Sequence, residues 1–143
     1  MTFKISAIIP VLGPQPLLRR AVASALSNSE IAELIVLDDG SPAALDLKPD
    51  PRVRIIRHEA NSGAGAARNT GAREAASDWL AFLDADDVWD PNKTKKQIEA
   101  LQSDRSGALG AVCAFGFQRG PRHVVCRPPE TRLDFGHALK GAR

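Results

Sequence analysis

Continuous apolar runs alternate with helical patterns along residues 5–103 of this chain. The runs predict buried strands, because each is short, is rich in apolar residues and ends at turn-forming or acidic residues. Four strands are predicted, at residues 5–11, 33–37, 53–57 and 79–83. Since strands that are apolar throughout are buried on both faces, the alternation predicts an α/β fold with a doubly wound, mostly parallel sheet flanked by helices.

The segments between these strands carry helix signals. Residues 16–26 begin with Pro16, which suits a first helical turn, and their apolar side chains share one face. Residues 64–76 are rich in alanine, whose small side chain allows close packing on a sheet. Asp90-Pro91 has the form of an N-cap followed by proline at the first helical position, and the helix that it starts is predicted to end near residue 103.

Beyond residue 107 the pattern is weaker. It predicts two strands and a helix, at residues 109–117, 123–126 and 133–140. Cys113 and Cys126 lie in the two strand segments outside any C-x-x-C arrangement, so we expect two buried, reduced thiols. No repeat or low-complexity linker divides the chain, so residues 1–143 are predicted to form a single domain.

Composition favours a folded protein with a core of ordinary size. The 143 residues are 43% apolar, and no apolar run approaches the roughly 18 residues of a membrane span. The N-terminal strand is too short for a signal peptide. We therefore expect a soluble, cytoplasmic protein.

Charge is distributed unevenly along the chain. Residues 1–92 carry 9 basic and 13 acidic side chains, whereas residues 93–143 carry 10 basic and 4 acidic ones. The basic part has the charge needed for peripheral contact with anionic lipid headgroups at the inner face of the membrane, although such a surplus also serves solubility. Nucleic acid is not an expected partner, because no basic stripe is interleaved with aromatic residues and tyrosine is absent.

Acidic residues follow two of the predicted strands. Asp84-Ala85-Asp86-Asp87 comes directly after the fourth strand, and Asp38-Asp39 ends the second, before the turn formers Gly40, Ser41 and Pro42. The carboxyl ends of parallel strands are where open α/β sheets bind ligands. Crowded carboxylates raise one another's pKa unless a cation or hydrogen-bond donors compensate, so the triple acid indicates a divalent metal.

Four motifs together resemble the family-2 glycosyltransferases with a GT-A (Rossmann-like) fold. They occur in that family's order and spacing over residues 3–103. The motifs are Ile8-Ile9-Pro10, Leu37-Asp38-Asp39-Gly40-Ser41, Asn61-Ser62-Gly63 with Ala67-Arg68-Asn69-Thr70-Gly71, and Phe82-Leu83-Asp84-Ala85-Asp86-Asp87.

The resemblance implies inverting transfer of a sugar from a nucleotide-diphosphate donor, most commonly a UDP-sugar, to an acceptor hydroxyl on a saccharide or a lipid-linked molecule. It also implies a divalent cation, Mg²⁺ or Mn²⁺, which suits carboxylate ligands and neutralises charge on the leaving diphosphate. By position, Asp86 is expected to be a metal ligand, and Asp84 to contact the metal or the ribose. Asp87 belongs either to this site or to the start of the following helix.

The resemblance also implies a nucleoside site. Asp39 is expected to accept a hydrogen bond from the base, while Asp38 supports the turn or contacts the nucleoside. Pro10 ends the first strand against the nucleoside. Family members commonly follow this proline with an aromatic residue and an asparagine, whereas here Leu12 is left to press on the base without aromatic stacking.

The loop before the alanine-rich helix is expected to contact the donor phosphates. Gly63 and Gly65 permit close approach of the backbone, and Arg68 either binds phosphate or pairs with an acid at the sheet edge. The histidines have no metal-ligand spacing and are expected to be ordinary surface or packing residues; they are His58, His123 and His137.

Complete catalytic domains of this family extend well beyond the length of this chain. The only acids after Asp104 are Glu130 and Asp134, which come too early for the family's acceptor-activating base. We therefore expect residues 3–103 to be the nucleotide-binding half, residues 104–143 to be an incomplete acceptor half, and the base to lie beyond Arg143. The chain is then part of a longer protein or a truncated form.

Two alternatives remain from the sequence. A non-catalytic nucleotide-sugar or metal-binding module is favoured by the substitution at Leu12 and the short C-terminal part. A dinucleotide-dependent oxidoreductase is suggested by Gly63-Ala64-Gly65, with Asp84 about twenty residues on. Against it, Arg68 replaces the third glycine, and residues 58–62 separate the motif from its strand.

Overall fold

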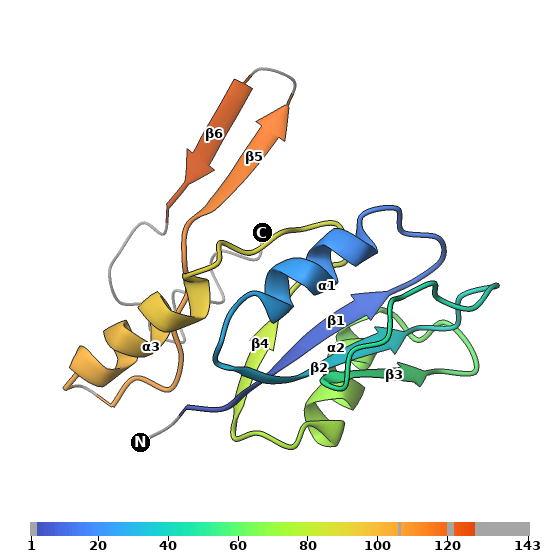
Figure 1. The fold of residues 1–143 in the computed structure, drawn as a ribbon, viewed down its shortest axis with the longest axis horizontal. Helices are drawn as coiled ribbons and strands as arrows, with labels where there is room; N and C mark the ends of the chain where they lie inside the picture. Colours follow the sequence, from blue (N-terminus) through green and yellow to red (C-terminus); the bar gives the residue numbers. More distant parts are fainter. Residues whose placement is uncertain (1–2, 106, 120–121, 128–143) are drawn as a thin grey trace. The chain divides into compact units, whose positions relative to one another are not determined.

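The computed structural model describes residues 3–105, 107–119 and 122–127 (Figure 1). The chain divides into two compact units, Met1–Ile98 and Glu99–Arg143. The described elements are β1 (Ile5–Val11), α1 (Leu18–Leu26), β2 (Ile31–Asp38), β3 (Val53–Arg57), α2 (Ala64–Glu74), β4 (Trp79–Phe82), α3 (Lys93–Ser103), β5 (Phe115–Arg119) and β6 (Arg122–Cys126).

The first unit contains a four-stranded, entirely parallel sheet in the order β3-β2-β1-β4. Its register aligns Val11 with Asp38 and Asp38 with Arg57. On the other side of β1, Ile8 aligns with Phe82 at the end of β4. The predicted parallel α/β sheet is therefore confirmed, and the carboxyl ends of its strands meet at one edge.

Helices cover both faces of the sheet (Figure 1). On one face Ala7 and Ile9 of β1 join the core cluster that includes Ala21 and Val22 of α1. The opposite face packs against α2, where a β-carbon built on Gly71 would meet the Ile8 side chain. Because β1 and β2 are central, their side chains are almost completely buried.

The outer strands are less buried than their apolar sequences predict. Within the described residues, β3 and β4 each pair with one neighbour only, so one side of each is open. Ile55 is 50% exposed and Phe82 is 47% exposed. The expectation of continuous burial is therefore correct for β1 and β2 and wrong for the two edge strands.

Several predicted boundaries shift by a few residues. β2 begins two residues earlier than predicted, at Ile31, and α1 begins at Leu18. Asp90-Pro91 forms the turn before α3 instead of its first helical turn, because the Asp90 carbonyl accepts the Lys93 N–H at 3.0 Å and its carboxylate accepts the Asn92 N–H at 2.9 Å.

The second unit contains an antiparallel pair, β5 and β6, in which Phe115 aligns with Cys126. The strand predicted at 109–117 begins only at Phe115, whereas 123–126 does lie within β6. Cys113 is exposed and Cys126 is half-buried, and both are free. Burial of both thiols was therefore a wrong expectation, because residues 107–114 form no strand.

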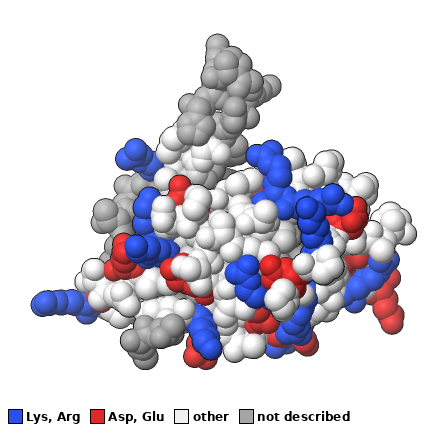
Figure 2. Space-filling model, viewed as in Figure 1, with Lys and Arg blue, Asp and Glu red and all other residues white. Residues whose placement is uncertain are grey.

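The predicted helix at 133–140 lies outside the described residues. Among the described helices, none combines the length and the apolar character that a bilayer span requires. Figure 2 shows basic and acidic side chains interspersed on the visible face of the described residues.

Replacing Gly71 by alanine is expected to destabilise the first unit by about 1–3 kcal/mol, because overpacking a dense core has a cost of this size. The new Cβ would lie 2.6 Å from Cγ2 of Ile8. Gly65→Ala in the same helix meets no atom within 4 Å, so it is expected to stabilise the protein by about 0.5–1 kcal/mol through helix propensity. Urea denaturation of both variants measures the difference, and equal stability would contradict the close packing of α2 on β1.

Candidate functional site

Two acidic turns lie at the carboxyl edge of the sheet, one on each side of β1. The Asp39 N–H donates to the Val11 carbonyl at 2.8 Å, and the Leu83 N–H donates to the Ile8 carbonyl at 3.1 Å. These bonds continue the parallel ladders of β2 and β4 to the first residue after each strand. The backbone therefore fixes both turns against β1, as expected for a ligand site in an open α/β sheet.

The turn after β2 is held by the Asp38 side chain, which is 1% exposed. Its Oδ1 accepts the Ser41 N–H at 2.8 Å, and its Oδ2 lies 3.2 Å from the guanidinium of Arg57. The Ser41 hydroxyl in turn accepts the Gly13 N–H at 2.9 Å, which ties the loop after β1 to the same turn. Of the two roles considered for Asp38, the structure shows the turn-supporting one.

Gly40 allows this turn to touch the loop between β3 and α2. Its φ of +81° lies in the left-handed region, which glycine adopts without strain. A β-carbon there would lie 2.8 Å from the backbone carbonyl carbon of Ala60 and from the backbone nitrogen of Asn61. Glycine at this position therefore lets two backbones meet beside Asp39.

The carboxylate of Asp39 is 3% exposed and accepts three hydrogen bonds. The N–H groups of Ser62 and Gly63 donate at 3.0 Å and 2.7 Å, and Nδ1 of His58 lies 2.7 Å from Oδ1. Burial raises the pKa of Asp39, but the Ser62 N–H, the His58 ring and the Gly63 N–H together hold it below the usual value. Asp39 is therefore a carboxylate at neutral pH.

The sequence interpretation missed His58, which was expected to be an ordinary surface or packing residue. Its ring lies between Asp39 and Oγ1 of Thr70, 3.1 Å from Nε2. These partners are 19 and 12 residues away along the chain, so no local motif pointed to them. His123 lies in β6, and His137 lies outside the described residues.

The acidic turn after β4 is exposed. Asp84 forms an ion pair with Arg68 of α2, so the structure shows the sheet-edge pairing considered for this arginine. The Asp87 N–H donates to the Asp84 carbonyl at 3.1 Å and closes the turn. Within the described part of the chain, the Asp86 carboxylate makes no hydrogen bond or ion pair, which leaves its oxygens open to a ligand.

The segment that follows the acidic turn is anchored to α1 and to the residues after it. The Trp89 N–H donates to Oγ of Ser24 at 3.1 Å. The buried Asn28 amide donates to the Asp90 carbonyl at 3.3 Å and accepts the Thr94 N–H at 3.1 Å. These contacts hold the end of the turn, while its carboxylates stay exposed.

The donor set of this turn fits a hard divalent cation that is shared with a ligand. Partial desolvation and the charges of Asp86 and Asp84 raise the pKa of Asp87, so the turn concentrates more negative charge than the single Arg68 ion pair compensates. No group of three or more Asp, Glu, His or Cys side chains that could hold a metal ion occurs among the described residues. Mg²⁺ commonly binds one or two carboxylates and completes its coordination with phosphates and water.

The remaining predicted site residues line the same edge. Pro10 is half-buried near the end of β1, and Leu12 is 44% exposed. Gly63, with φ of +89°, gives its N–H to Asp39 and to Oδ1 of Asn61 at 2.9 Å. Contact of these residues with a nucleotide stays a prediction.

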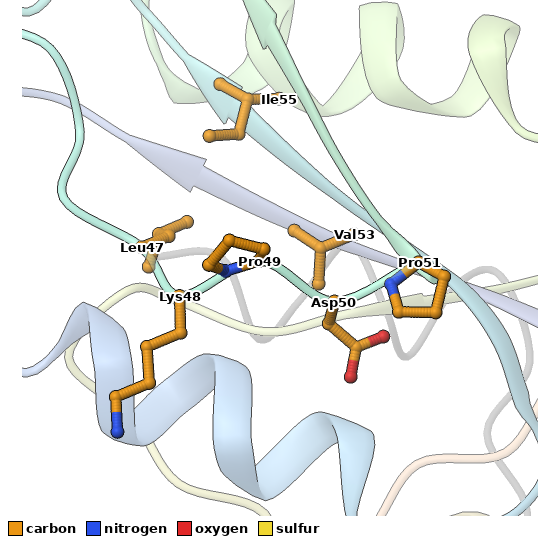
Figure 3. Close-up of a pocket in the computed structure, with 7 residues that line it drawn as sticks. All are labelled: Leu47, Lys48, Pro49, Asp50, Pro51, Val53 and Ile55. Atoms are coloured by element: carbon orange, nitrogen blue, oxygen red, sulfur yellow. The ribbon is translucent and has the colours of Figure 1, made fainter.

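A cavity of about 390 Å³ lies elsewhere on the first unit (Figure 3). It is lined by Leu47, Lys48, Pro49, Asp50, Pro51, Val53 and Ile55. Val53 and Ile55 align with Leu34 and Val36, which precede Asp38 in β2 by four and two residues. The cavity therefore lies along the outer strand β3 and contains none of the acids of the two turns.

Comparison with known proteins decides the family of this chain. A profile described as Glycosyl transferase family 2 matches residues 6–137. The chain belongs to glycosyl transferase family 2. This membership confirms the resemblance seen in the four motifs and removes the oxidoreductase alternative.

Among its relatives is the succinoglycan biosynthesis protein ExoO of Rhizobium meliloti, which is 42% identical over 98 residues. That match covers 65% of this chain and 28% of ExoO. Escherichia coli WfgD, named as a UDP-Glc:alpha-D-GlcNAc-diphosphoundecaprenol beta-1,3-glucosyltransferase, is 32% identical over 69% of this chain and 41% of its own length. The chain therefore spans less than half the length of these relatives.

The fold has solved counterparts. The crystal structure of S. aureus TarS 1-349 gives a TM-score of 0.60 at 20% identity, over 70% of this chain and 32% of TarS. The complex of the same protein with UDP gives 0.58 at 21% identity. This likeness confirms the predicted GT-A type of α/β fold.

Asp87→Asn is expected to raise the melting temperature of the metal-free protein at neutral pH. For an acid whose folded pKa is raised, the folded state binds the proton more tightly, so stability is lost as the pH rises from the unfolded value of 3.8 through the folded pKa. The gain should vanish below the ordinary aspartate value of 3.8. Thermal melts in EDTA measure it, with the exposed Asp78→Asn as control, and no gain at neutral pH would contradict the crowding of charge in this turn.

Proposed function

We propose that this chain is the donor-binding part of an inverting glycosyltransferase that uses a UDP-sugar and a divalent cation, Mg²⁺ or Mn²⁺. The observation that carries the proposal is the convergence of two acidic turns, Asp38–Ser41 and Asp84–Asp87, on either side of the end of β1. Support for the nucleotide comes from the UDP complex of TarS and from the UDP-Glc in the name of WfgD.

In this proposal the two turns have different tasks. Asp86, which is exposed and has no protein partner among the described residues, is the direct ligand of the cation, and Asp84 contributes to its shell or contacts the ribose. The cation, when bound, neutralises the charge that develops on the departing diphosphate. Asp39 accepts a hydrogen bond from the base, and Leu12 lies against the base face.

Arg68 is the residue whose partner has to change. It pairs with Asp84 in the structure, and its guanidinium fork is also suited to phosphate oxygens. We propose that the bound cation competes with Arg68 for Asp84, while the diphosphate competes with Asp84 for Arg68, so that the arginine moves from the carboxylate to the phosphates. The Arg68 guanidinium then compensates the negative charge of the acidic turn in the free protein and the negative charge of the donor phosphates in the complex.

For the complete enzyme we also propose an acceptor-activating base and a class of acceptor. In the proposal an acid of the complete enzyme activates the acceptor hydroxyl, and loss of such a base lowers rates by about 10² to 10⁴. We assign the base to the part of the relatives that this chain does not span, and a saccharide or a lipid-linked molecule to the acceptor site. A cytoplasmic location with peripheral contact to the inner face of the membrane, through the basic residues of 93–143, completes the proposal.

A non-catalytic nucleotide-sugar-binding module is the second candidate. It is favoured by Leu12, which is exposed and replaces the aromatic residue that stacks on a base in the family pattern. Such a module keeps the donor site and lacks the transfer reaction. Assays of sugar transfer to a defined acceptor distinguish the two candidates.

Isothermal titration of the 143-residue chain with UDP and GDP, each in Mn²⁺ and in EDTA, tests the donor site. We expect UDP to bind at least about tenfold more tightly with Mn²⁺ than without it, because the cation joins the diphosphate to the acidic turn. Equal UDP affinity with Mn²⁺ and in EDTA would contradict the metal assignment. Absence of nucleotide binding in every condition would contradict both candidate functions.

A further inference from the structure

His58 connects three elements around Asp39. Its N–H donates to the Asp38 carbonyl at 2.8 Å, which extends the β2–β3 ladder one step beyond the strand. Its side chain is 18% exposed, with Nδ1 2.7 Å from Asp39 and Nε2 3.1 Å from Oγ1 of Thr70 on α2. The ring is therefore held at both nitrogens, and it faces the carboxylate assigned to the base.

The partners of the ring decide which nitrogen carries hydrogen. Asp39 is ionised at neutral pH and can only accept, so Nδ1 of His58 donates to it. In the neutral ring, Nε2 then accepts the Thr70 hydroxyl hydrogen. Thr70 still accepts from Arg73, whose guanidinium lies 3.1 Å from Oγ1, because a hydroxyl has one hydrogen and two lone pairs.

His58 also sets how many acceptor positions Asp39 has left. An ionised carboxylate offers about four lone-pair positions, two on each oxygen. Oδ1 accepts from His58 and from the Ser62 N–H, while Oδ2 accepts from the Gly63 N–H. Both positions on Oδ1 are thus occupied, and one position on Oδ2 is left.

We infer that His58 is a specificity-determining residue that restricts Asp39 to a base presenting a single N–H, as uracil does. The inference rests on the proposed donor site. Guanine presents two adjacent donors, its ring N–H and its amino group, which pair with both oxygens of a carboxylate. With Oδ1 filled by His58 and Ser62, that two-oxygen pairing is blocked. A buried polar group left without its partner discriminates strongly between ligands.

Two substitutions separate this role from simple packing. His58→Leu removes the donor to Oδ1, whereas His58→Asn keeps an N–H at about the position of Nδ1. Thr70→Val serves as a control that removes the outer partner of the ring and leaves the donor to Asp39. Titration calorimetry with UDP and GDP in Mn²⁺ gives the preference for UDP over GDP for each variant, after urea denaturation has confirmed that it folds.

We expect His58→Leu to lower the preference for UDP over GDP at least about tenfold, since hydrogen bonds to charged groups are worth a factor of this size. His58→Asn and Thr70→Val should keep the preference within about threefold, because both retain the side-chain donor of residue 58 on Oδ1 beside the Ser62 N–H. Equal weakening of UDP and GDP binding by His58→Leu would overturn the inference and leave the donor site intact. A wild-type chain that binds neither nucleotide would overturn the proposed function, and the inference with it.

Discussion

Asp86→Asn is expected to abolish the metal-dependent part of UDP binding while leaving the fold unchanged. Loss of a residue that only orients a metal ligand lowers metal affinity by about 10–100-fold, so loss of a direct ligand should lower it by at least about 100-fold. The side chain is exposed, and its replacement by an amide of the same shape disturbs no described hydrogen bond. The measurement is UDP affinity in Mn²⁺ and in EDTA.

Asp78→Asn is the matched control for this substitution. Asp78 is also an exposed acid next to β4, but it precedes the strand and so lies at its opposite end. The control should keep the wild-type response to Mn²⁺. If the Asp86→Asn variant still gains UDP affinity from Mn²⁺, Asp86 is not the metal ligand, and Asp84 and Asp87 are the next residues to substitute.

Gly40→Ala is expected to destabilise the first unit by about 2–5 kcal/mol, since a left-handed backbone costs a residue with a β-carbon about 1–2 kcal/mol and a steric clash adds a further 1–3. Both effects apply because φ is +81° and the β-carbon would lie 2.8 Å from backbone atoms of Ala60 and Asn61. Displacement of that loop also removes the Ser62 and Gly63 donors from Asp39. We therefore expect UDP binding to fall together with stability.

Gly13→Ala separates the two effects. Gly13 has a similar φ of +72°, but a β-carbon there meets nothing within 4 Å. Gly13→Ala is expected to lower the free energy of unfolding only by the cost of the left-handed backbone, about 1–2 kcal/mol. Urea denaturation gives both values, and equal losses at the two glycines would show that the turn and the loop do not touch as described.

The fold was largely predictable because its signal is local. Each strand of the sheet is a short run in which most residues are apolar, and in the two central strands, β1 and β2, most side chains are buried. The position of the acids was predictable for the same reason, since they follow strands whose ends share one edge. Exposure of Ile55 and Phe82 was not predictable from their runs, because it depends on which strands are central.

The hydrogen-bond and ion-pair partners of the site residues were not predictable, because they come from segments that are distant in the sequence. Arg68 suited either phosphate or an acid, and only the packing of α2 on β1 and β2 brings it to Asp84. His58 reaches Asp39 because β3 lies next to β2 in a particular register. Cys113 was assigned to a strand on residue type alone, although residues 107–114 form no strand.

Division of the chain into a nucleotide-binding half and an acceptor half stays a prediction, as do the cation and the base. Each of these depends on a bound donor, cation or acceptor. The structure shows the two acidic turns on either side of β1. The residues of these turns and their contacts are the ones that substitution can test.

Nuclear magnetic resonance of the isotope-labelled 143-residue chain tests whether the donor and its cation bind between the two acidic turns, with UDP present and Mg²⁺ replaced stepwise by paramagnetic Mn²⁺. We expect UDP to shift the amide signals of Asp39 and Gly63, and Mn²⁺ then to broaden the signals of Asp84–Asp87 first. UDP shifts that spare the Asp38–Ser41 turn, or broadening that begins at other acids such as Asp46 and Asp50, would contradict binding between the two turns.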